Sequence, residues 1–206
     1  MDNILIVAAH ADDAELMAGG SMIKWIQEDK KIVVVTFTDG ALTLPDGKVY
    51  RSKEEASMEE KLLSNFIGYK SENIGHKNHY LTFSDDNVLA LLDIIEKYKI
   101  DTLVCPNSHD VVHDHEVASR IAIAASRRIQ NVLMGQINYF LDSFFTPNVF
   151  VDISHTWEKK IEALKLYKSQ WRPDWFEFLD ATSIYYGKMI GVKRAEGFVS
   201  NKIVLK

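Results

Sequence analysis

Two stretches of the 206-residue chain concentrate side chains that can bind a metal ion or move a proton. The first directly follows the apolar run Ile4–Ala9 and contains His10, Asp12 and Asp13. Adjacent side chains point in different directions in a helix or a strand, so Asp12 and Asp13 are expected to have different roles. Imidazole paired with carboxylate is a common ligand set for zinc. The alternative is a helix capped by Asp13, with His10 a buried structural histidine.

The second stretch reads PNSHDVVHDHEVASR, from Pro106 to Arg120, and follows another apolar run, Thr102–Pro106. Its histidines are His109, His113 and His115, with acidic residues between them. If both apolar runs are strands of one parallel sheet, both stretches leave the sheet at the same edge and can meet in space. The alternative is a solvated polar loop that leads into a helix with an acidic first turn.

Together the two stretches could build a hydrolytic metal site. Such a site needs three protein ligands and an open position for water. His10, Asp13 and one histidine of the second stretch can supply the ligands. Asp12 is then left as the base that takes a proton from water whose pKa the metal lowers.

The elements that must position these residues alternate along the chain. Buried strands are expected over Ile4–Ala9, Ile32–Thr38, Thr102–Pro106 and Val149–Ile153, with Val132–Tyr139 as a fifth candidate. Helical patterns cover Ala14–Asp29, Ser52–Ile67, Asn87–Tyr98, His115–Arg128 and Thr156–Ser169, and loops are expected over Asp39–Gly47 and Asn138–Pro147. This order predicts an α/β fold with a mostly parallel sheet, in a single domain.

Composition excludes several other classes of protein. The formal net charge is −5 and no basic cluster is present, so nucleic acid is not an expected partner. Cys105 is the single cysteine, which excludes an internal disulfide and is typical of a reducing compartment. No apolar run reaches the length of a membrane span, and no signal peptide is recognisable. We therefore expect a cytoplasmic protein.

The two stretches resemble the motifs of a known family. AHADDAE, residues 9–15, is similar to the AHPDDxE motif of the PIG-L/LmbE-like zinc deacetylases, with Ala11 in place of proline. VHDH, residues 112–115, is similar to that family's HxDH motif, with Val112 in place of the first histidine. TFTDG (36–40), VDIS (151–154) and RAEGF (194–198) resemble further family segments in the same order. The whole chain, 1–206, is therefore expected to be one domain of this family.

The resemblance implies a Rossmann-like fold with helices on both faces of the sheet, and hydrolysis of N-acetyl groups. His10, Asp13 and His115 are then the ligands of one divalent metal, usually Zn²⁺, and Asp12 is the general base. A mixed nitrogen and oxygen site also accepts other divalent ions such as Fe²⁺. The implied substrate is a small acetamido sugar of the N-acetylglucosamine type, a sugar conjugate or a nucleotide sugar. A homo-oligomer is possible.

Val112 stands where the family pattern has a histidine, and the resemblance implies that this histidine polarises the amide of the substrate. His113 is the first candidate to replace the missing histidine, His109 a second, and Tyr139 a candidate donor to the oxyanion. Arg51 is a candidate substrate contact. The departure leaves two other functions open. One is an amidase acting on another N-acylated sugar or thiol conjugate, and the other is a metal- or sugar-binding homologue with weakened catalysis.

For other polar and aromatic residues, the sequence supports less specific predictions. Asp114 is expected either to hydrogen-bond a histidine ligand or to cap a helix. His76 and His79 lie in a polar segment and are expected at the surface. The last third of the chain is rich in aromatic residues, which either pack in the core or a subunit interface or stack on a sugar: Trp171, Trp175, Phe176, Phe178, Tyr185 and Tyr186.

Overall fold

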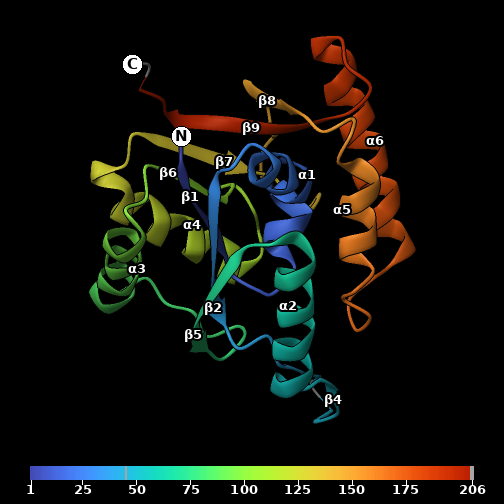
Figure 1. Cartoon of the computed structure of the whole chain (residues 1–206). Coiled ribbons are helices and arrows are strands. Elements are labelled where there is room, and N and C mark those ends of the chain that lie inside the picture. Colours follow the sequence, from blue (N-terminus) through green and yellow to red (C-terminus); the bar gives the residue numbers. More distant parts are fainter. Residues whose placement is uncertain (45, 205–206) are drawn as a thin grey trace.

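A seven-stranded sheet forms the centre of the protein, in a computed structural model that describes residues 1–44 and 46–204 (Figure 1). The strand order is β5-β2-β1-β6-β7-β9-β8. The bounds are β1 Asn3–Ala8, β2 Lys31–Thr38, β5 Lys70–His76, β6 Thr102–Pro106, β7 Asn131–Gly135, β8 Val149–Asp152 and β9 Ala195–Lys202. The strands from β5 to β7 pair in parallel, and β9 pairs antiparallel with both β7 and β8.

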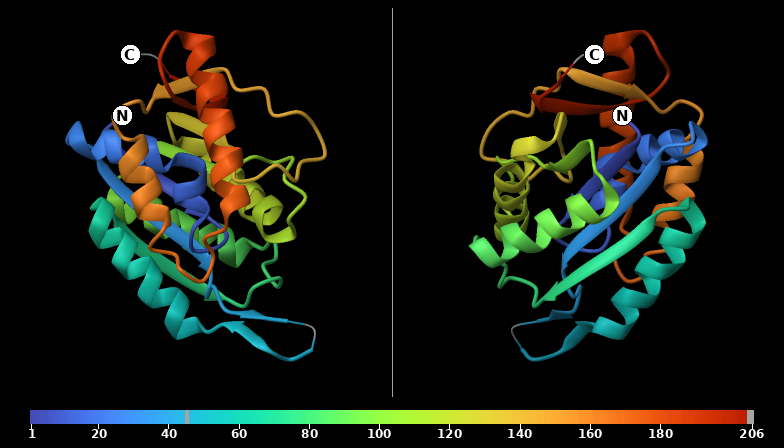
Figure 2. Two further views of the ribbon diagram at one scale, coloured as in Figure 1. Left: turned by 90° about the vertical axis from the view of Figure 1, so that its right-hand side faces the viewer. Right: turned by 60° about the vertical axis from the view of Figure 1, so that its left-hand side comes forward.

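Helices cover both faces of this sheet (Figures 1 and 2). One face carries α1 Asp13–Gln27, α2 Lys53–Ile67, α5 Trp157–Leu164 and α6 Pro173–Ile190. The other carries α3 Asp85–Tyr98 and α4 His113–Ala125, which is followed by a short 3₁₀ turn over Ser126–Arg128. A small hairpin of β3 Leu42–Thr43 and β4 Val49–Arg51 projects beyond the sheet edge. In the described ranges, no helix has both the length and the apolar character required to cross a membrane.

Strand β1 shows why the inner strands read as continuous apolar runs. Ile4 and Ile6 pack into the core under α1 and α2, whereas Leu5 and Val7 pack into the core under α3 and α4. All four side chains are fully buried. Burial of one such side chain stabilises a fold by about 1.5–3 kcal/mol. A strand covered on both faces therefore needs an apolar residue at every position rather than at alternate ones.

The structure confirms the predicted α/β class, with a mostly parallel sheet and helices on both faces, and corrects several elements. The predicted loop over Asp39–Gly47 contains β3, the candidate strand Val132–Tyr139 ends at Gly135, and the helix predicted to reach Ser169 ends at Leu164. Strands β5 and β9 and helix α6 were not predicted. The sequence of β5, KSENIGH, is mostly polar because β5 is an edge strand, and the aromatic pattern of α6 lacks clear helical spacing.

A buried ion pair fixes the position of α1 on the sheet. Lys160 Nζ of α5 lies 2.6 Å from Glu196 Oε1 of β9 and donates to the carbonyl oxygen of Leu16 at 2.8 Å. The Glu196 carboxylate also accepts from the backbone N–H groups of Gly20 at 2.9 Å and Ser21 at 2.7 Å. Three elements that are distant in the sequence are thus joined at one carboxylate, and α1 carries a residue of the site described below.

Removing the lysine charge should strongly destabilise the fold. In Lys160→Met, Glu196 stays buried without its cation, which costs about 3–5 kcal/mol of unfolding free energy. Chemical denaturation measures this loss. Lys165→Met, at an exposed position just after α5, is the matched control and should change stability by less than about 0.5 kcal/mol. Equal stability of the two variants would show that the buried pair contributes nothing.

Candidate metal centre

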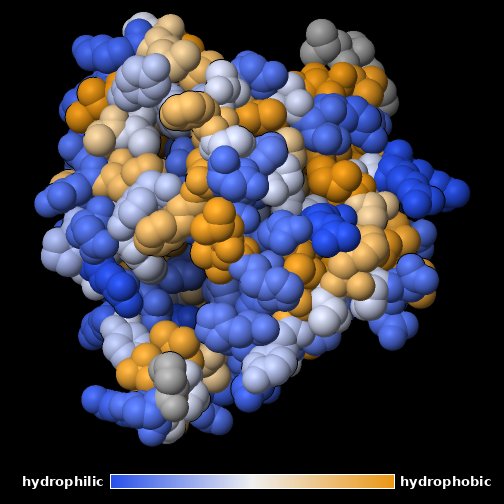
Figure 3. All heavy atoms as spheres, turned by 180° about the vertical axis from the view of Figure 1, so that it is seen from behind, coloured by the Kyte–Doolittle hydropathy of each residue, from blue (hydrophilic) through white to orange (hydrophobic). Residues whose placement is uncertain are grey.

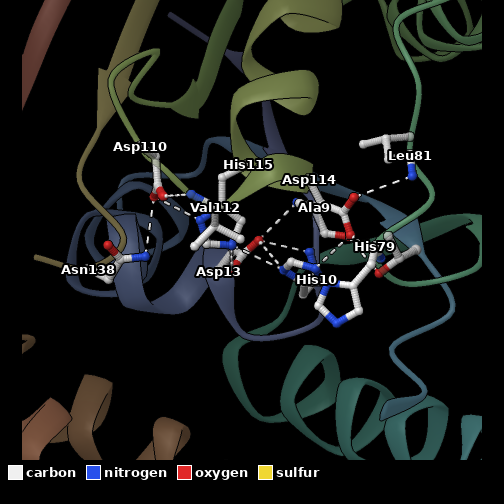
Figure 4. A network of polar contacts seen from close by, with 11 residues as sticks. Ala9, His10, Asp13, His79, Leu81, Asp110, Val112, Asp114, His115 and Asn138 are labelled. Atoms are coloured by element: carbon white, nitrogen blue, oxygen red, sulfur yellow. Dashed lines mark hydrogen bonds and ion pairs between the residues drawn. The ribbon is translucent and has the colours of Figure 1, made fainter. Parts of the chain in front are cut away.

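The two chemically dense stretches meet at the carboxyl edge of the sheet. Strands β1 and β6 are parallel neighbours, with Ile6 opposite Val104, so the segments that follow them leave the sheet side by side. His10 lies in the turn after β1, Asp13 is the first residue of α1, and His115 lies in the first turn of α4 (Figure 4). The fold therefore brings together three residues that span 105 positions of the sequence.

The side chains of these three residues face one common point. His10 Nδ1 lies 3.1 Å from His115 Nε2 and 3.5 Å from Asp13 Oδ2, and His115 Nε2 lies 3.3 Å from Asp13 Oδ1. Tetrahedral zinc with ligand bonds of about 2.0–2.1 Å holds its ligand atoms about 3.3 Å apart. Among the described residues, this is the one group with the composition and spacing of a metal site. The donor set and the spacing thus fit a divalent ion.

The Asp13 carboxylate is held in place by the backbone of the preceding turn. Its Oδ2 accepts from the N–H groups of Ala9 at 3.0 Å and His10 at 2.8 Å. Burial opposes ionisation of Asp13, but the facing imidazoles of His115 and His10 outweigh this effect and hold the pKa of its carboxyl group well below the usual range. Asp13 is therefore ionised and oriented before any ligand arrives.

Each histidine has a carboxylate behind it. His115 Nδ1 lies 2.8 Å from Asp110 Oδ2, and His10 Nε2 lies 3.2 Å from Asp114 Oδ2. Such carboxylates fix the tautomer and orientation of histidine ligands. Of the two roles expected for Asp114, a hydrogen bond to a histidine or a helix cap, the contact with His10 matches the first. The role of Asp110 was missed by sequence reasoning, although its place between β6 and α4 was a usable signal.

Both carboxylates also tie the site to neighbouring loops (Figure 4). Asp110 accepts from the Val112 N–H at 2.9 Å and from Asn138 Nδ2 at 3.2 Å. Asp114 accepts from the backbone N–H groups of His79 at 2.6 Å and Leu81 at 3.3 Å. The orientation of both histidines therefore depends on three separate loops.

The same carboxylates raise the basicity of the two imidazoles in the metal-free protein. Burial alone lowers the pKa of His10, but hydrogen bonds to Asp114 and Asp13 raise it to about 9. For His115, burial is outweighed by Asp13 and by Asp110, which raise the pKa to about 10. A cluster of carboxylates around two protonated imidazoles is a site that attracts positive charge.

Asp12 differs from its neighbour in conformation and in contacts. It occupies the N-cap position of α1 at φ 124°, makes no capping hydrogen bond and is 6% exposed. A positive φ of this size is strained for a residue with a side chain, and such strain collects at functional sites. Burial, followed by the charge of Asp13, raises the pKa of the Asp12 carboxyl group to about 7. Asp12 is thus a carboxyl group poised to exchange a proton near neutrality.

One cavity of about 370 Å³ contains this cluster and several other predicted residues. His10, Asp12, Asp13, His115, Arg51 and Tyr139 all line it. His113 does not line it in the described part of the chain. Its Nε2 lies 2.9 Å from the Leu81 carbonyl oxygen, and His109 is exposed and faces Asp142. His79 lines the cavity although its side chain is exposed, as expected.

Three buried polar atoms at the cavity lack a hydrogen-bond partner within the described ranges: Arg51 Nη1, Asn78 Oδ1 and Gln170 Nε2. Arg51 Nη1 lies 3.8 Å from Glu59 Oε2, beyond hydrogen-bond distance. Unpaired buried polar groups are costly and rare in proteins. Three residues that line the cavity therefore each carry one buried atom whose hydrogen-bonding capacity no group in the described ranges satisfies. The sequence analysis assigned no role to Asn78 or Gln170.

Residues 5–126 match the family model for PIG-L, described as GlcNAc-PI de-N-acetylase. The match covers more than half of the chain. The chain belongs to the PIG-L family. Diacetylchitobiose deacetylase of Thermococcus kodakarensis is 27% identical over 224 residues, covering 94% of this chain and 81% of the relative.

Two solved structures superpose over the whole chain. The conserved protein TT1542 of Thermus thermophilus matches with a TM-score of 0.85 at 26% identity, covering 100% of this chain and 97% of its own. GalB of Pseudomonas putida KT2440, a 4-carboxy-2-hydroxymuconate hydratase, matches with a TM-score of 0.82 at 17% identity. The match covers 100% of this chain and 98% of GalB. Because this fold also carries a hydratase, the reaction of the PIG-L family member must be argued from its site.

Removing either imidazole should release the metal. We expect the purified protein to hold about one divalent ion per chain, and His10→Ala or His115→Ala to hold far less, because two ligands cannot complete the site. Elemental analysis after gel filtration measures this. His155→Ala, at an exposed histidine, is the matched control and should keep the metal. A full metal content in His115→Ala would place the ion elsewhere.

Metal affinity should fall steeply with decreasing pH. Below pKa values of about 9 and 10, His10 and His115 each carry a proton that the metal must displace. The association constant is therefore expected to fall by up to about a hundredfold per pH unit between about pH 8 and 6, as followed by chelator competition. Asp110→Asn removes one cause of the raised pKa of His115 and should give a shallower dependence. A flat pH profile would contradict the assignment of both histidines.

Proposed function

We propose that this protein is a metal-dependent hydrolase that removes the N-acetyl group from an acetamido sugar or sugar conjugate of the N-acetylglucosamine type. The observation that carries the proposal is the strained Asp12, which makes no capping hydrogen bond and lies beside the His10–Asp13–His115 cluster in one cavity. The family description and the diacetylchitobiose deacetylase relative support the substrate class.

The three clustered side chains would hold the metal, with Zn²⁺ favoured by the donor set and spacing and Fe²⁺ as the alternative. A divalent ion in this position supplies Lewis acidity, which lowers the pKa of water and polarises an amide carbonyl. The protein contributes a rigid ligand set, because Asp13 is fixed by two backbone N–H groups and each histidine by a carboxylate.

Asp12 moves the protons of the reaction. Amide hydrolysis consumes one water, whose oxygen joins the acetyl carbon while the carbon–nitrogen bond breaks. The Asp12 carboxylate accepts a proton from that water and returns it to the leaving amine nitrogen. A pKa of about 7 for its carboxyl group in the metal-free protein suits a group that must do both near neutral pH. The second proton of the water stays with the acetic acid, which ionises to acetate and a proton, and the sugar keeps the free amine.

The polar side of the cavity would orient the sugar. Arg51, Asn78 and Gln170 line the cavity, and their guanidinium and amide groups offer the donors and acceptors that suit the hydroxyl groups of a sugar. Tyr139 is half exposed at the cavity, so we assign it to contact with the outer part of the substrate rather than to the oxyanion.

A second candidate is a homologue that binds a metal and a sugar without hydrolysis. Val112 at the cavity favours it, because valine cannot donate a hydrogen bond to the developing oxyanion, and loss of one such donor costs about 3–4 kcal/mol. The strained Asp12 in the same cavity favours hydrolysis, since binding alone has no use for it. A screen for released acetate and for other released acids, over N-acylated sugars, nucleotide sugars and thiol conjugates, separates hydrolysis of acetyl groups, amidase action and binding alone.

Removing the base should abolish hydrolysis and leave the metal in place. Asp12→Asn keeps the size of the side chain but cannot accept the proton, so acetate release should fall by about 10²- to 10⁴-fold. Asp93→Asn, at an exposed position of α3, is the matched control and should keep full activity. Acetate assays and elemental analysis of both variants provide the comparison. Undiminished turnover by Asp12→Asn would remove the proposed mechanism.

A further inference from the structure

The side chain of Val112 leaves one side of the metal cluster without a hydrogen-bond donor. Val112 occupies the N-cap position of α4, shortly before His115, and lines the cavity. When water adds to the carbon of an amide, negative charge develops on the former carbonyl oxygen, and a donor aimed at this oxygen lowers the barrier. A hydrolase built on this cluster therefore needs a donor from another element.

His79, in the loop between β5 and α3, is linked to the cluster through Asp114. The Asp114 Oδ2 atom accepts from the backbone N–H of His79 at 2.6 Å and lies 3.2 Å from His10 Nε2. The other ring nitrogen of His10, Nδ1, faces His115 and Asp13. In Figure 4, His10 accordingly lies between His79 and Asp13. His79 is therefore a neighbour of the metal cluster.

The backbone around His79 is held in place by contacts on both sides. Leu81, which is fully buried, donates its N–H to Asp114 Oδ1 at 3.3 Å, and the Tyr80 N–H donates to the Lys77 carbonyl oxygen at 3.1 Å. His79 itself has φ 68°, in the left-handed region. Residues with a side chain rarely adopt this conformation, and those that do collect at functional sites. The turn therefore sets the direction of the His79 side chain.

The imidazole of His79 lines the cavity and is available to a ligand. In residues 1–44 and 46–204, no hydrogen bond or ion pair engages its ring nitrogens. Leu42 and Arg51 of the β3–β4 hairpin line the same cavity, and Figure 3 shows the surface hollowed between this hairpin and the body of the molecule. The exposed His79 side chain therefore lies where a substrate that fills the cavity would cover it.

We propose that His79 is a catalytic residue, whose imidazole N–H donates a hydrogen bond to the oxyanion that forms as water adds to the acetamido carbon. This inference rests on the proposed function. The donated hydrogen stays on the imidazole, so Asp12 still carries the proton from water to the leaving amine. His79 thereby supplies, from the loop between β5 and α3, the donor that Val112 does not offer at α4.

Replacement of His79 by glycine separates the role of the imidazole from the stability of the fold. Glycine adopts φ 68° without strain, so His79→Gly should keep the turn, as chemical denaturation can show. For acetate release from N-acetylglucosamine and N,N'-diacetylchitobiose, we expect kcat to fall about 10- to 100-fold with little change in KM, because the bond forms only in the transition state. His155→Ala, at an exposed histidine outside the cavity, is the matched control and should keep the wild-type kcat.

Binding of an oxyanion analogue gives a readout that does not depend on turnover. N-methylphosphonyl glucosamine carries negative oxygen on a tetrahedral phosphorus, in place of the planar acetyl carbon. Calorimetry on the metal-containing protein should show that His79→Gly weakens binding of this compound about 10- to 100-fold and binding of glucosamine by less than about threefold. Because glycine retains the N–H that Asp114 binds, elemental analysis should find the wild-type metal content in His79→Gly.

The possible failures differ from one another. A kcat for His79→Gly close to that of the wild type, with undiminished binding of the analogue, would overturn this inference and leave the proposed function intact. A raised KM at unchanged kcat would assign the imidazole to sugar binding and also overturn it. Loss of metal from His79→Gly would assign the loop to the metal site instead, with the same consequence. Absence of acid release by the wild type from every compound of the screen would overturn the proposed function together with this inference.

Discussion

The carboxylate of Asp13 is the constraint on which the site depends. Through one oxygen it closes the sharp turn after β1 by accepting two backbone N–H groups, and through the other it faces His115 on a different element. The turn, the start of α1 and the approach of α4 are therefore set by one charged group. A neutral side chain at this position would leave the two N–H groups with a weaker acceptor and both imidazoles without their nearest negative charge.

Much of this arrangement follows from the sequence, because its causes are local or periodic. The apolar runs of β1, β2 and β6 mark strands covered on both faces, and parallel strands place their following loops at one edge. This reasoning paired His10 and Asp13 with a histidine about a hundred residues away, and separated the role of Asp12 from that of Asp13. The family motif then selected His115 from three candidates, and the geometry agrees with that choice.

What the sequence did not predict depends on contacts between distant loops. His113 and His115 look alike in the sequence, yet one turns toward the Leu81 carbonyl and the other toward Asp13, which depends on the packing of α4. Asn78 and Gln170 are ordinary polar residues until the fold leaves Asn78 Oδ1 and Gln170 Nε2 buried without a hydrogen-bond partner among the described residues. Strand β5 and helix α6 lack the expected periodicity, because one is a polar edge strand and the other buries only part of an aromatic-rich surface.

The position of Glu196 has a consequence for biosynthesis. Its carboxylate binds the amide of Gly20, 176 residues earlier, and the ammonium of Lys160. In a nascent chain, β1, β2 and β6 leave the ribosome long before β9. The Gly20 amide and the Lys160 ammonium therefore lack their shared carboxylate until the last strand has been synthesised.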